Sequence, residues 1–305
     1  MMCLTMMLLI AGCSQTSSTE KKTGQGSLQI KDFSDRTLSF DSTPKRIVAL
    51  STGDMSIVYA LGEKVVGRPS ADLPASLKKA SDIQEVGTTH QFDLELITSL
   101  QPDVVLGHEQ LNAKDVASIE GIGSQMLLTS VNSVKDIQRQ ITLFGDLLDK
   151  EKKAKALNEK IEQRMLGVQK SKKAIRTLVV YGAPGTYMAA LPNSLSGNLL
   201  ELAGGANIAA DEPALEQFPQ YAQINAEKVI EADPDLILLM THSNPKDVKA
   251  GFISEMKQNA AWHDVTAVKE GRIEILPNDL FGTNPGIEVM DALDYLEKKL
   301  KRLAV

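Results

Sequence analysis

The sequence predicts an α/β protein made of two Rossmann-like lobes, each with a central sheet, joined by one long α-helix. Three observations support this prediction: short apolar runs alternate with helical patterns, one helix–strand unit occurs twice, and a long amphipathic stretch separates the two copies. The expected boundaries are an N-terminal lobe at 28–132, a linking helix at 133–172 and a C-terminal lobe at 173–305.

The first 12 residues form an apolar, uncharged run, which is too short to cross a bilayer because a helical span needs about 20 residues. Such a run is typical of a secretory signal peptide. It ends Ile10-Ala11-Gly12-Cys13, which resembles the bacterial lipobox, where cleavage before the cysteine leaves an acylated N-terminus. We therefore expect Cys13 to be lipidated, and residues 13–27, which are polar and aperiodic, to form a flexible tether.

Several function classes are disfavoured by composition. The two cysteines are Cys3, which would be removed with the signal, and Cys13, which lipid would occupy, so no thiol is left for a disulfide, a zinc site or a nucleophile. A net charge of −6 without a basic patch argues against nucleic-acid binding. Because no phosphate loop, Ser/His/Asp order or metal-hydrolase spacing is present, we expect no enzymatic activity.

Short apolar runs bounded by turn residues or by helical patterns are expected to be strands. In the N-terminal lobe they are Arg46–Leu50, Lys64–Val66, Asp103–Gly107 and Gln125–Thr129. In the C-terminal lobe they are Thr177–Tyr181, Leu236–Met240 and Arg272–Leu276. Their alternation with helices predicts parallel sheets.

The repeated unit spans Phe92–Leu106 and recurs 132 residues later as Ile224–Leu238. Each copy opens with a residue suited to cap a helix, Asp93 or Asn225, and then breaks at Pro-Asp before an apolar strand. Two copies of this unit predict two lobes of related architecture, although short helix–strand units of this kind also recur by chance.

The stretch from Val134 to Ser171 carries apolar residues at helical spacing, with Ser133 as the expected cap. If it is one helix, its 38 residues would extend about 57 Å. Such a helix would brace both lobes, and Gly145 could bend it.

Taken together, the lipobox, the tether and the two lobes resemble the substrate-binding lipoproteins of ABC importers for iron-siderophores, cobalamin and haem. Within that family the chain is most similar to haem-receptor lipoproteins of the iron-regulated surface determinant type of Gram-positive bacteria. The segments that carry the resemblance are Arg46–Val48, Val66–Pro69, Val86-Gly87, Gly182–Tyr187, Leu202–Ile208, His242 with Pro245, and Phe281-Gly282. It implies a class III periplasmic-binding-protein fold, a monomer, and transported haem b as the ligand.

The resemblance also implies the ligands of the haem iron. In such receptors a methionine of the N-terminal lobe and a histidine of the C-terminal lobe hold the metal, and these fall on His90 and His242. His90 departs from that pattern but preserves a ligand, because thioether and imidazole both bind haem iron. His242 follows the expected strand Leu236–Met240, and open α/β sheets bind ligands at the carboxyl ends of strands. His108 also ends a strand and is the alternative ligand of the N-terminal lobe.

Other pocket positions are implied in the same way. The segment Leu50, Ser51, Thr52 and Gly53 opens a helix whose N–H groups would receive the haem propionates. Asp54 would oppose that charge, and Arg68 would compensate. Apolar contacts to the porphyrin are expected from Phe92, Tyr187, Met188, Met240 and Phe281.

The expected partners are an ABC permease with its ATPase, the membrane through the lipid anchor, and upstream haem-donor surface proteins. Glu95 and Glu227, at equivalent places in the two repeat copies, are expected to dock the permease at the outer face of the membrane. Two alternatives stay open: a ferric-siderophore or cobalamin receptor, and a tetrapyrrole metal chelatase. The lipobox argues against the chelatase, whose chemistry belongs in the cytosol.

Overall fold

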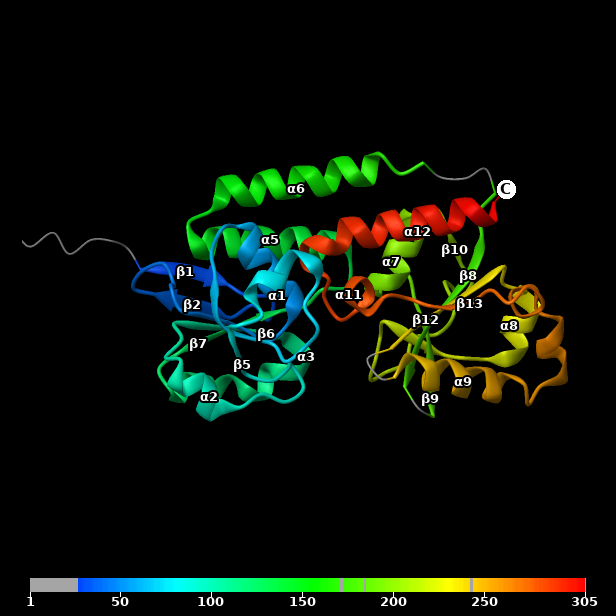
Figure 1. The fold of residues 1–305 in the computed structure, drawn as a ribbon, viewed down its shortest axis with the longest axis horizontal. Coiled ribbons are helices and arrows are strands. Elements are labelled where there is room, and N and C mark those ends of the chain that lie inside the picture. The colour runs from blue at the N-terminus through cyan, green and yellow to red at the C-terminus, as the bar shows by residue number, and fades with distance from the viewer. Residues whose placement is uncertain (1–26, 170–172, 184, 242–243, 305) are drawn as a thin grey trace, which may run out of the picture.

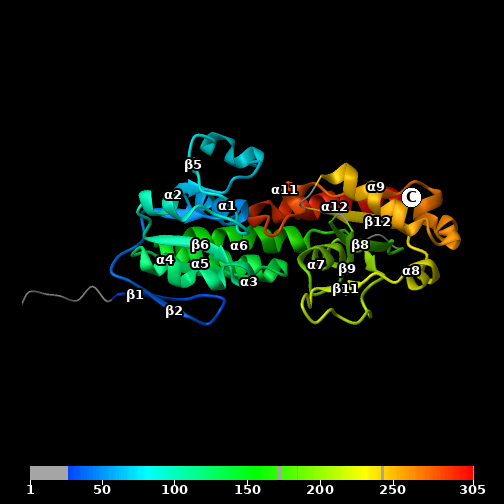
Figure 2. The same cartoon turned by 90° about the horizontal axis from the view of Figure 1, so that it is seen from below.

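The computed structural model describes residues 27–169, 173–183, 185–241 and 244–304, and it contains two lobes side by side (Figures 1 and 2). Each lobe has a central sheet with helices around it. The predicted α/β class with parallel sheet cores is therefore confirmed.

The N-terminal lobe is built on a five-stranded parallel sheet in the order β5-β4-β3-β6-β7. All three residues of the central strand β3 are apolar and buried, as expected where both faces of a parallel sheet are covered. The strands are β3 (Ile47–Ala49), β4 (Val65–Arg68), β5 (Gln84–Glu85), β6 (Val104–His108) and β7 (Gln125–Thr129), and β1 (Leu28–Lys31) with β2 (Thr37–Phe40) forms a separate hairpin. The helices are α1 (Thr52–Ala60), η1 (Ala75–Ala80), α2 (Leu94–Ser99), α3 (Glu109–Asn112), η2 (Ala113–Asp115) and α4 (Val116–Gly121).

The C-terminal lobe has a mixed sheet in the order β11-β9-β8-β12-β13, with β10 beside β8. Strands β10, β8, β12 and β13 run parallel, whereas β9 and β11 are antiparallel to their neighbours. The strands are β8 (Arg176–Ala183), β9 (Thr186–Ala190), β10 (Ala206–Asn207), β11 (Tyr221–Gln223), β12 (Leu236–Met240) and β13 (Ile273–Ile275). The helices are α7 (Leu195–Leu202), α8 (Ala226–Ala232), α9 (Pro245–Met256), η3 (Ala260–Asp264), α10 (Thr266–Lys269), α11 (Asn278–Phe281), η4 (Gly286–Glu288) and α12 (Val289–Leu303).

All seven predicted strands are present as β3, β4, β6, β7, β8, β12 and β13. The strands that were not predicted are short or lack a continuous apolar run, as in TYMAA of β9 and YAQ of β11. No helix in the described part of the chain is both long and apolar enough to span a membrane.

The prediction of one continuous linking helix is wrong. The segment forms two helices, α5 (Val134–Leu148) and α6 (Glu151–Leu166), which pack against each other. The helix α5 ends at Asp149, whose φ of 57° is left-handed, a conformation that Asp tolerates better than most residues. Gly145 lets α6 pack close against α5, because a Cβ at this position would lie only 2.5 Å from the Cβ of Ala154. The break was not predicted because apolar residues keep helical spacing on both sides of this turn. The expected N-cap is confirmed, because the Ser133 hydroxyl accepts a hydrogen bond from the Asp136 amide.

The two repeat copies have the same local structure. Asp93 and Asn225 are the N-caps of α2 and α8, and each side chain accepts hydrogen bonds from the amides two and three residues later. The residue before the proline has positive φ in both copies, at Gln101 and Asp233. The internal similarity read from the sequence therefore corresponds to similar geometry.

An arginine fixes each copy to its sheet. The carboxylates of Asp103 and Asp235 accept hydrogen bonds from the backbone amides of Arg46 and Arg176, which lie at the start of β3 and β8. The two guanidinium groups donate to carbonyls at the C-terminal ends of α2 and α8. Each lobe thus repeats one helix–strand junction.

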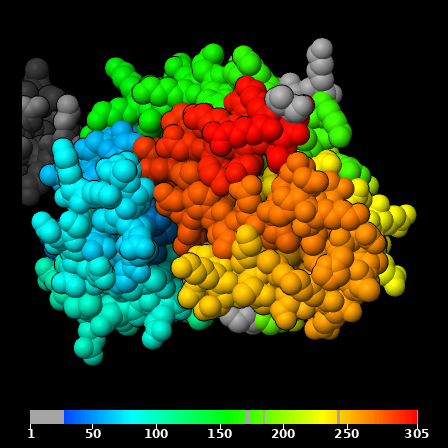
Figure 3. All heavy atoms as spheres, turned by 45° about the vertical axis from the view of Figure 1, so that its right-hand side comes forward, coloured from blue at the N-terminus to red at the C-terminus, as the bar shows by residue number. Residues whose placement is uncertain are grey.

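The chain returns from the C-terminal lobe to pack on α1. Gly286 has a φ of 58°, and a Cβ there would lie 2.5 Å from the Gly53 carbonyl oxygen, so glycine is required for this contact. The Ile287 amide donates to Ser56 Oγ at 3.2 Å. Figure 3 shows the red helix α12 against the green helices, where Glu297 forms an ion pair with Arg164 of α6. The lobes are therefore joined by the returning segment as well as by the helical hairpin.

Candidate functional site

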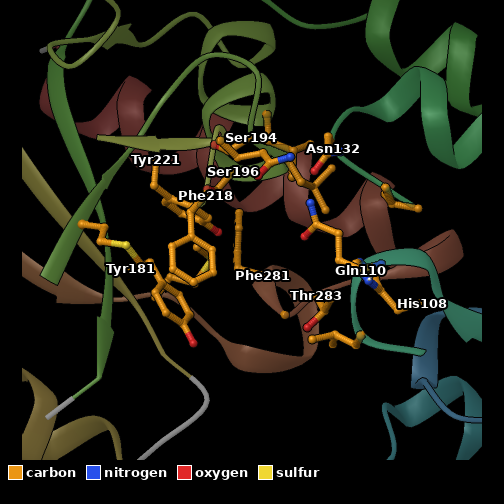
Figure 4. A pocket seen from close by; sticks show the side chains of 18 of the residues that line it. His108, Gln110, Asn132, Tyr181, Ser194, Ser196, Phe218, Tyr221, Phe281 and Thr283 are labelled. Carbon is orange, nitrogen blue, oxygen red and sulfur yellow. Dashed lines mark hydrogen bonds between the residues drawn. The ribbon is translucent and has the colours of Figure 1, made fainter. Parts of the chain in front are cut away.

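A cleft of about 260 Å³ lies between the two lobes (Figure 4). Strands β6 and β12 reach it with their carboxyl ends, where open α/β sheets bind ligands. The described residues that line it are His90, His108, Gln110, Leu111, Val131, Asn132, Tyr181, Met188, Ser194, Leu195, Ser196, Leu199, Phe218, Gln220, Tyr221, Met240, Phe281, Gly282 and Thr283.

Two histidines lie on the wall formed by the N-terminal lobe. His90 is exposed in the loop between β5 and α2, and His108 is the last residue of β6. The buried side chain of Asn112 holds both segments, because its Oδ1 accepts from the His108 amide at 2.9 Å and its Nδ2 donates to the Thr89 carbonyl at 2.9 Å. Both candidate ligands of the N-terminal lobe are therefore brought to one cleft.

The His108 ring is already used by the fold. It is the N-cap of α3, and its Nδ1 accepts a hydrogen bond from the Gln110 amide at 3.2 Å. Burial lowers the pKa of His108, Glu109 opposes this effect, and the nearby His90 lowers the pKa further. A neutral ring that accepts at Nδ1 has its proton on Nε2. Nδ1 is occupied by this hydrogen bond and Nε2 carries the proton, so the ring offers no free lone pair to a metal. This favours His90 as the metal ligand of the N-terminal lobe.

Aromatic side chains form the opposite wall. Tyr181 and Tyr221 have ring centroids 5.6 Å apart, and burial, together with the neighbouring Tyr181, raises the pKa of Tyr221 to about 12. Both tyrosines lie beside Phe218, which is 48% exposed (Figure 4). A large apolar side chain left open in a cleft is typical of a ligand-binding surface. This wall suits a flat, aromatic ligand.

Three of the predicted apolar contacts also line the cleft: Met188, Met240 and Phe281. Met188 comes from β9, Met240 ends β12, and Phe281 ends α11, so three separate elements supply them. Phe281 is held by an edge-to-face contact with Tyr295 of α12, at 5.8 Å between ring centroids.

Polar neutral side chains line part of the cleft, among them Ser194, Ser196 and Asn132 (Figure 4). Among the described lining residues there is no lysine, arginine, aspartate or glutamate. Any charge on a ligand would therefore be met by imidazole, hydroxyl, amide or backbone groups.

Arg68 does not line the cleft. Its guanidinium donates to the carbonyls of Ile83, Pro69 and Ser81 and to the carboxylate of Glu85. The side chain is buried within the N-terminal lobe and stabilises the segment after β4, so this placement gives no support to a role in charge compensation.

Phe92 and Tyr187 also lie outside the cleft lining. Phe92 packs against an apolar cluster of the N-terminal lobe that contains Val48 and Ile97. Tyr187 donates to the Val248 carbonyl at 3.2 Å and contacts Phe252 edge-on, with ring centroids 5.4 Å apart. Both aromatic rings are used in packing within their own lobes.

None of Leu50, Ser51, Thr52 and Gly53 lines the cleft. The Ser51 hydroxyl donates to the carboxylate of Asp54, which is buried at the start of α1. Burial raises the pKa of Asp54 to about 6, despite hydrogen bonds from Ser51, Gln140, Thr129 and Asn284. A second anion at this helix end would be repelled whenever Asp54 is ionised, so this placement gives no support to the propionate role expected of the segment.

The remaining predicted positions are at the surface or outside the described residues. Glu95 and Glu227 are exposed in the first turns of α2 and α8. Cys13 and His242 lie outside the described residues, and His242 follows Met240 by two positions in the sequence.

Sequence analysis missed Tyr181, Phe218 and Tyr221 as cleft residues. Tyr181 ends a predicted strand on the carboxyl side, which was a usable signal. Phe218 and Tyr221 belong to a segment without periodicity, so only the folded chain shows where they lie.

Comparisons with known proteins agree with this architecture. The model of the family described as "Periplasmic binding protein" matches residues 47–280. The high-affinity heme uptake system protein IsdE of Staphylococcus aureus (strain bovine RF122 / ET3-1) is 27% identical over 298 residues, covering 95% of this chain and 92% of that protein.

Two solved structures are similar along most of their length. An ABC transporter substrate-binding protein from Listeria monocytogenes EGD-e is 31% identical with a TM-score of 0.72, covering 86% of this chain and 100% of that one. S. aureus IsdE complexed with heme is 27% identical with a TM-score of 0.71, covering 84% of this chain and 98% of that one.

Proposed function

We propose that this chain, which belongs to the periplasmic binding protein family, captures haem outside the cell and delivers it to the permease of an ABC importer for iron uptake. The family binds and delivers substrates and does not transform them. The chain is homologous to the haem uptake protein IsdE and similar in structure to that protein in complex with heme.

The observation that carries the proposal is the composition of the cleft. It combines an open imidazole, His90, with an aromatic wall that contains Tyr181 and Phe218. Imidazole is a common axial ligand of haem iron, and a porphyrin is a flat apolar ring that such a wall can cover.

His90 and His242 are the proposed axial ligands, one from each lobe. The proposed anchor is an acylated Cys13, and the proposed docking residues for the permease are Glu95 and Glu227. These assignments place a lipid-anchored monomer at the outer face of the cytoplasmic membrane, with the cleft available to haem-donor proteins.

Titration of the purified protein with hemin tests the proposal. We expect a shifted and sharpened Soret band that saturates at one hemin per chain, and co-elution of haem with the protein in size-exclusion chromatography. Two competitors serve as controls: a ferric hydroxamate siderophore and cobalamin. Saturable binding of either one without any Soret change on hemin addition would contradict the proposal and support the alternative cargo.

A further inference from the structure

We propose that the N-terminal end of helix α7, together with the hydroxyl group of Ser196, binds a carboxylate of the ligand. The inference rests on the proposed haem function and extends it, because it assigns the negatively charged edge of the porphyrin to one end of the cleft.

Ser196 provides the first observation. It lines the cleft, is only 5% exposed, and its Oγ has no hydrogen-bond partner among the described residues. Buried hydroxyl groups nearly always have a partner, because an unpaired one loses its bonds to water without replacement. A ligand group placed beside Ser196 would supply that partner after a rotation of the hydroxyl about χ1.

The helix end provides the second observation. The neighbouring Ser194 is fully used: its Oγ accepts from the Gly197 amide at 3.1 Å and donates to the Leu191 carbonyl at 2.6 Å. Leu195 and Ser196 are the first two residues of α7, so no carbonyl within the helix can accept from their amides. These amides and the helix dipole favour an anion at this position.

Residues of the N-terminal lobe close the same end of the cleft. The Val134 amide donates to Asn198 Oδ1 at 3.0 Å, which ties α7 to the start of α5. Asn132 faces the same space and offers a side-chain amide (Figure 4). The carboxylate of Asp136 is occupied by the Ser133 hydroxyl at 2.8 Å and the Asn132 backbone amide at 3.0 Å. Residues from both sides of the cleft thus line the region near the start of α7.

Neutral donors suit this task. The described part of the cleft lining contains no carboxylate that would repel an anion and no cation that would bind it elsewhere. At the start of α7, backbone amides that have no acceptor within the helix lie beside a buried hydroxyl that has no partner among the described residues. The rival position at the start of α1 holds the buried Asp54 carboxylate instead.

A double-mutant cycle between protein and ligand tests the assignment. The full chain and its Ser196→Ala variant are titrated with hemin and with hemin dimethyl ester, in which both carboxylates are blocked. We expect Ser196→Ala to weaken hemin binding about tenfold, as for the loss of a hydrogen bond to a charged group, and to change ester binding by less than about twofold. Because Ser196 Oγ has no partner among the described residues, Ser196→Ala removes no hydrogen bond that the structure shows and should not lower the thermal unfolding temperature.

Two further variants complete the test. Ser124→Ala removes another buried serine hydroxyl, just before β7, and should change the affinity for neither hemin nor its dimethyl ester. Thr52→Val probes the start of α1. If Thr52→Val, and not Ser196→Ala, selectively weakened hemin relative to the ester, the carboxylate would lie at α1 and the proposal would be wrong. Equal effects of Ser196→Ala on both ligands, or none, would also overturn it while leaving haem binding intact. Failure of the unmodified protein to bind hemin would instead overturn the proposed function as well.

Discussion

The backbone amide of Gln110 donates a 3.2 Å hydrogen bond to Nδ1 of His108, and this contact separates the two histidines of the N-terminal wall. Accepting at Nδ1 requires the neutral ring to be protonated on Nε2, so neither nitrogen offers a free lone pair to a metal. His90 is exposed in its loop and lines the same cleft. This helix cap therefore favours His90 over His108 as the proposed iron ligand of the N-terminal lobe.

This relationship predicts different effects of two alanine variants. His90→Ala should remove the low-spin bis-imidazole signature of the hemin complex in absorption and electron paramagnetic resonance spectra, and should weaken hemin binding roughly tenfold or more. His108→Ala should keep the low-spin signature and cost about 1 kcal/mol of stability through loss of the cap. The reverse pattern, with the spectrum lost only in His108→Ala, would make His108 the ligand.

The buried Asp54 predicts how stability depends on pH. Its pKa is raised from 3.8 to about 6 by burial, so the native state holds this proton more tightly than the unfolded state. The resulting stabilisation is complete below about pH 4 and is lost as the pH rises through about 6, with a magnitude of about 3 kcal/mol. The difference in unfolding free energy between wild type and Asp54→Asn should therefore change by that amount between pH 4 and pH 8.

Urea denaturation across this pH range measures the effect of Asp54. Asp41→Asn, an exposed substitution, serves as the matched control. A difference between wild type and Asp54→Asn that stays constant with pH would show that Asp54 does not titrate in this range in the folded protein.

Glu95 and Glu227 are exposed first-turn residues whose helices are capped by other side chains, Asp93 and Asn225. Changing both glutamates to alanine should cost only about 0.3–1 kcal/mol each and leave hemin affinity unchanged. Haem-dependent growth, or transport in reconstituted vesicles, should fall sharply if these carboxylates meet arginines of the permease. The control pair Glu120→Ala and Glu231→Ala removes one exposed glutamate from each lobe, and normal transport by the Glu95/Glu227 variant would refute the docking role.

The returning segment predicts limited motion between the lobes. Gly286 packs on Gly53, and the Ile287 amide donates a hydrogen bond to Ser56 Oγ, so opening the cleft would break these close contacts. Small-angle scattering should show little change in the radius of gyration on hemin loading. A Gly286→Ala variant, which places a Cβ 2.1 Å from Ser56 Oγ, should unfold at a lower temperature and show a wider spread of shapes. A marked contraction of the wild-type protein on loading would contradict this expectation.

Much of the fold could be read from local patterns. The strand Leu236–Met240 was predicted to the residue because five consecutive apolar residues bounded by Pro-Asp and Thr-His have few other solutions. The caps Asp93, Asn225 and Ser133 were predicted because a short polar side chain satisfies amides within its own turn. These features depend on neighbours in the chain.

The linking segment shows where local patterns fail. Its apolar spacing is compatible with one helix or two, and the outcome depends on the close contact between Gly145 and Ala154, nine residues apart. A periodic pattern records which face is buried but not whether the partner is another lobe or the same chain folded back.

The sequence by itself determined the α/β class, the two related lobes, the seven strands and the presence of His90, Met188, Met240 and Phe281 as candidates for the cleft. Only the tertiary structure showed that Arg68 is buried in the N-terminal lobe and that the Asp54 carboxylate accepts from the N-cap Ser51. It alone also showed that Ser196 Oγ, beside the cleft, has no partner among the described residues. The physical reason is the range of the interactions involved. Periodicity and capping act within one or two turns of chain, whereas burial, charge compensation and the pairing of a hydroxyl depend on residues that only folding brings together.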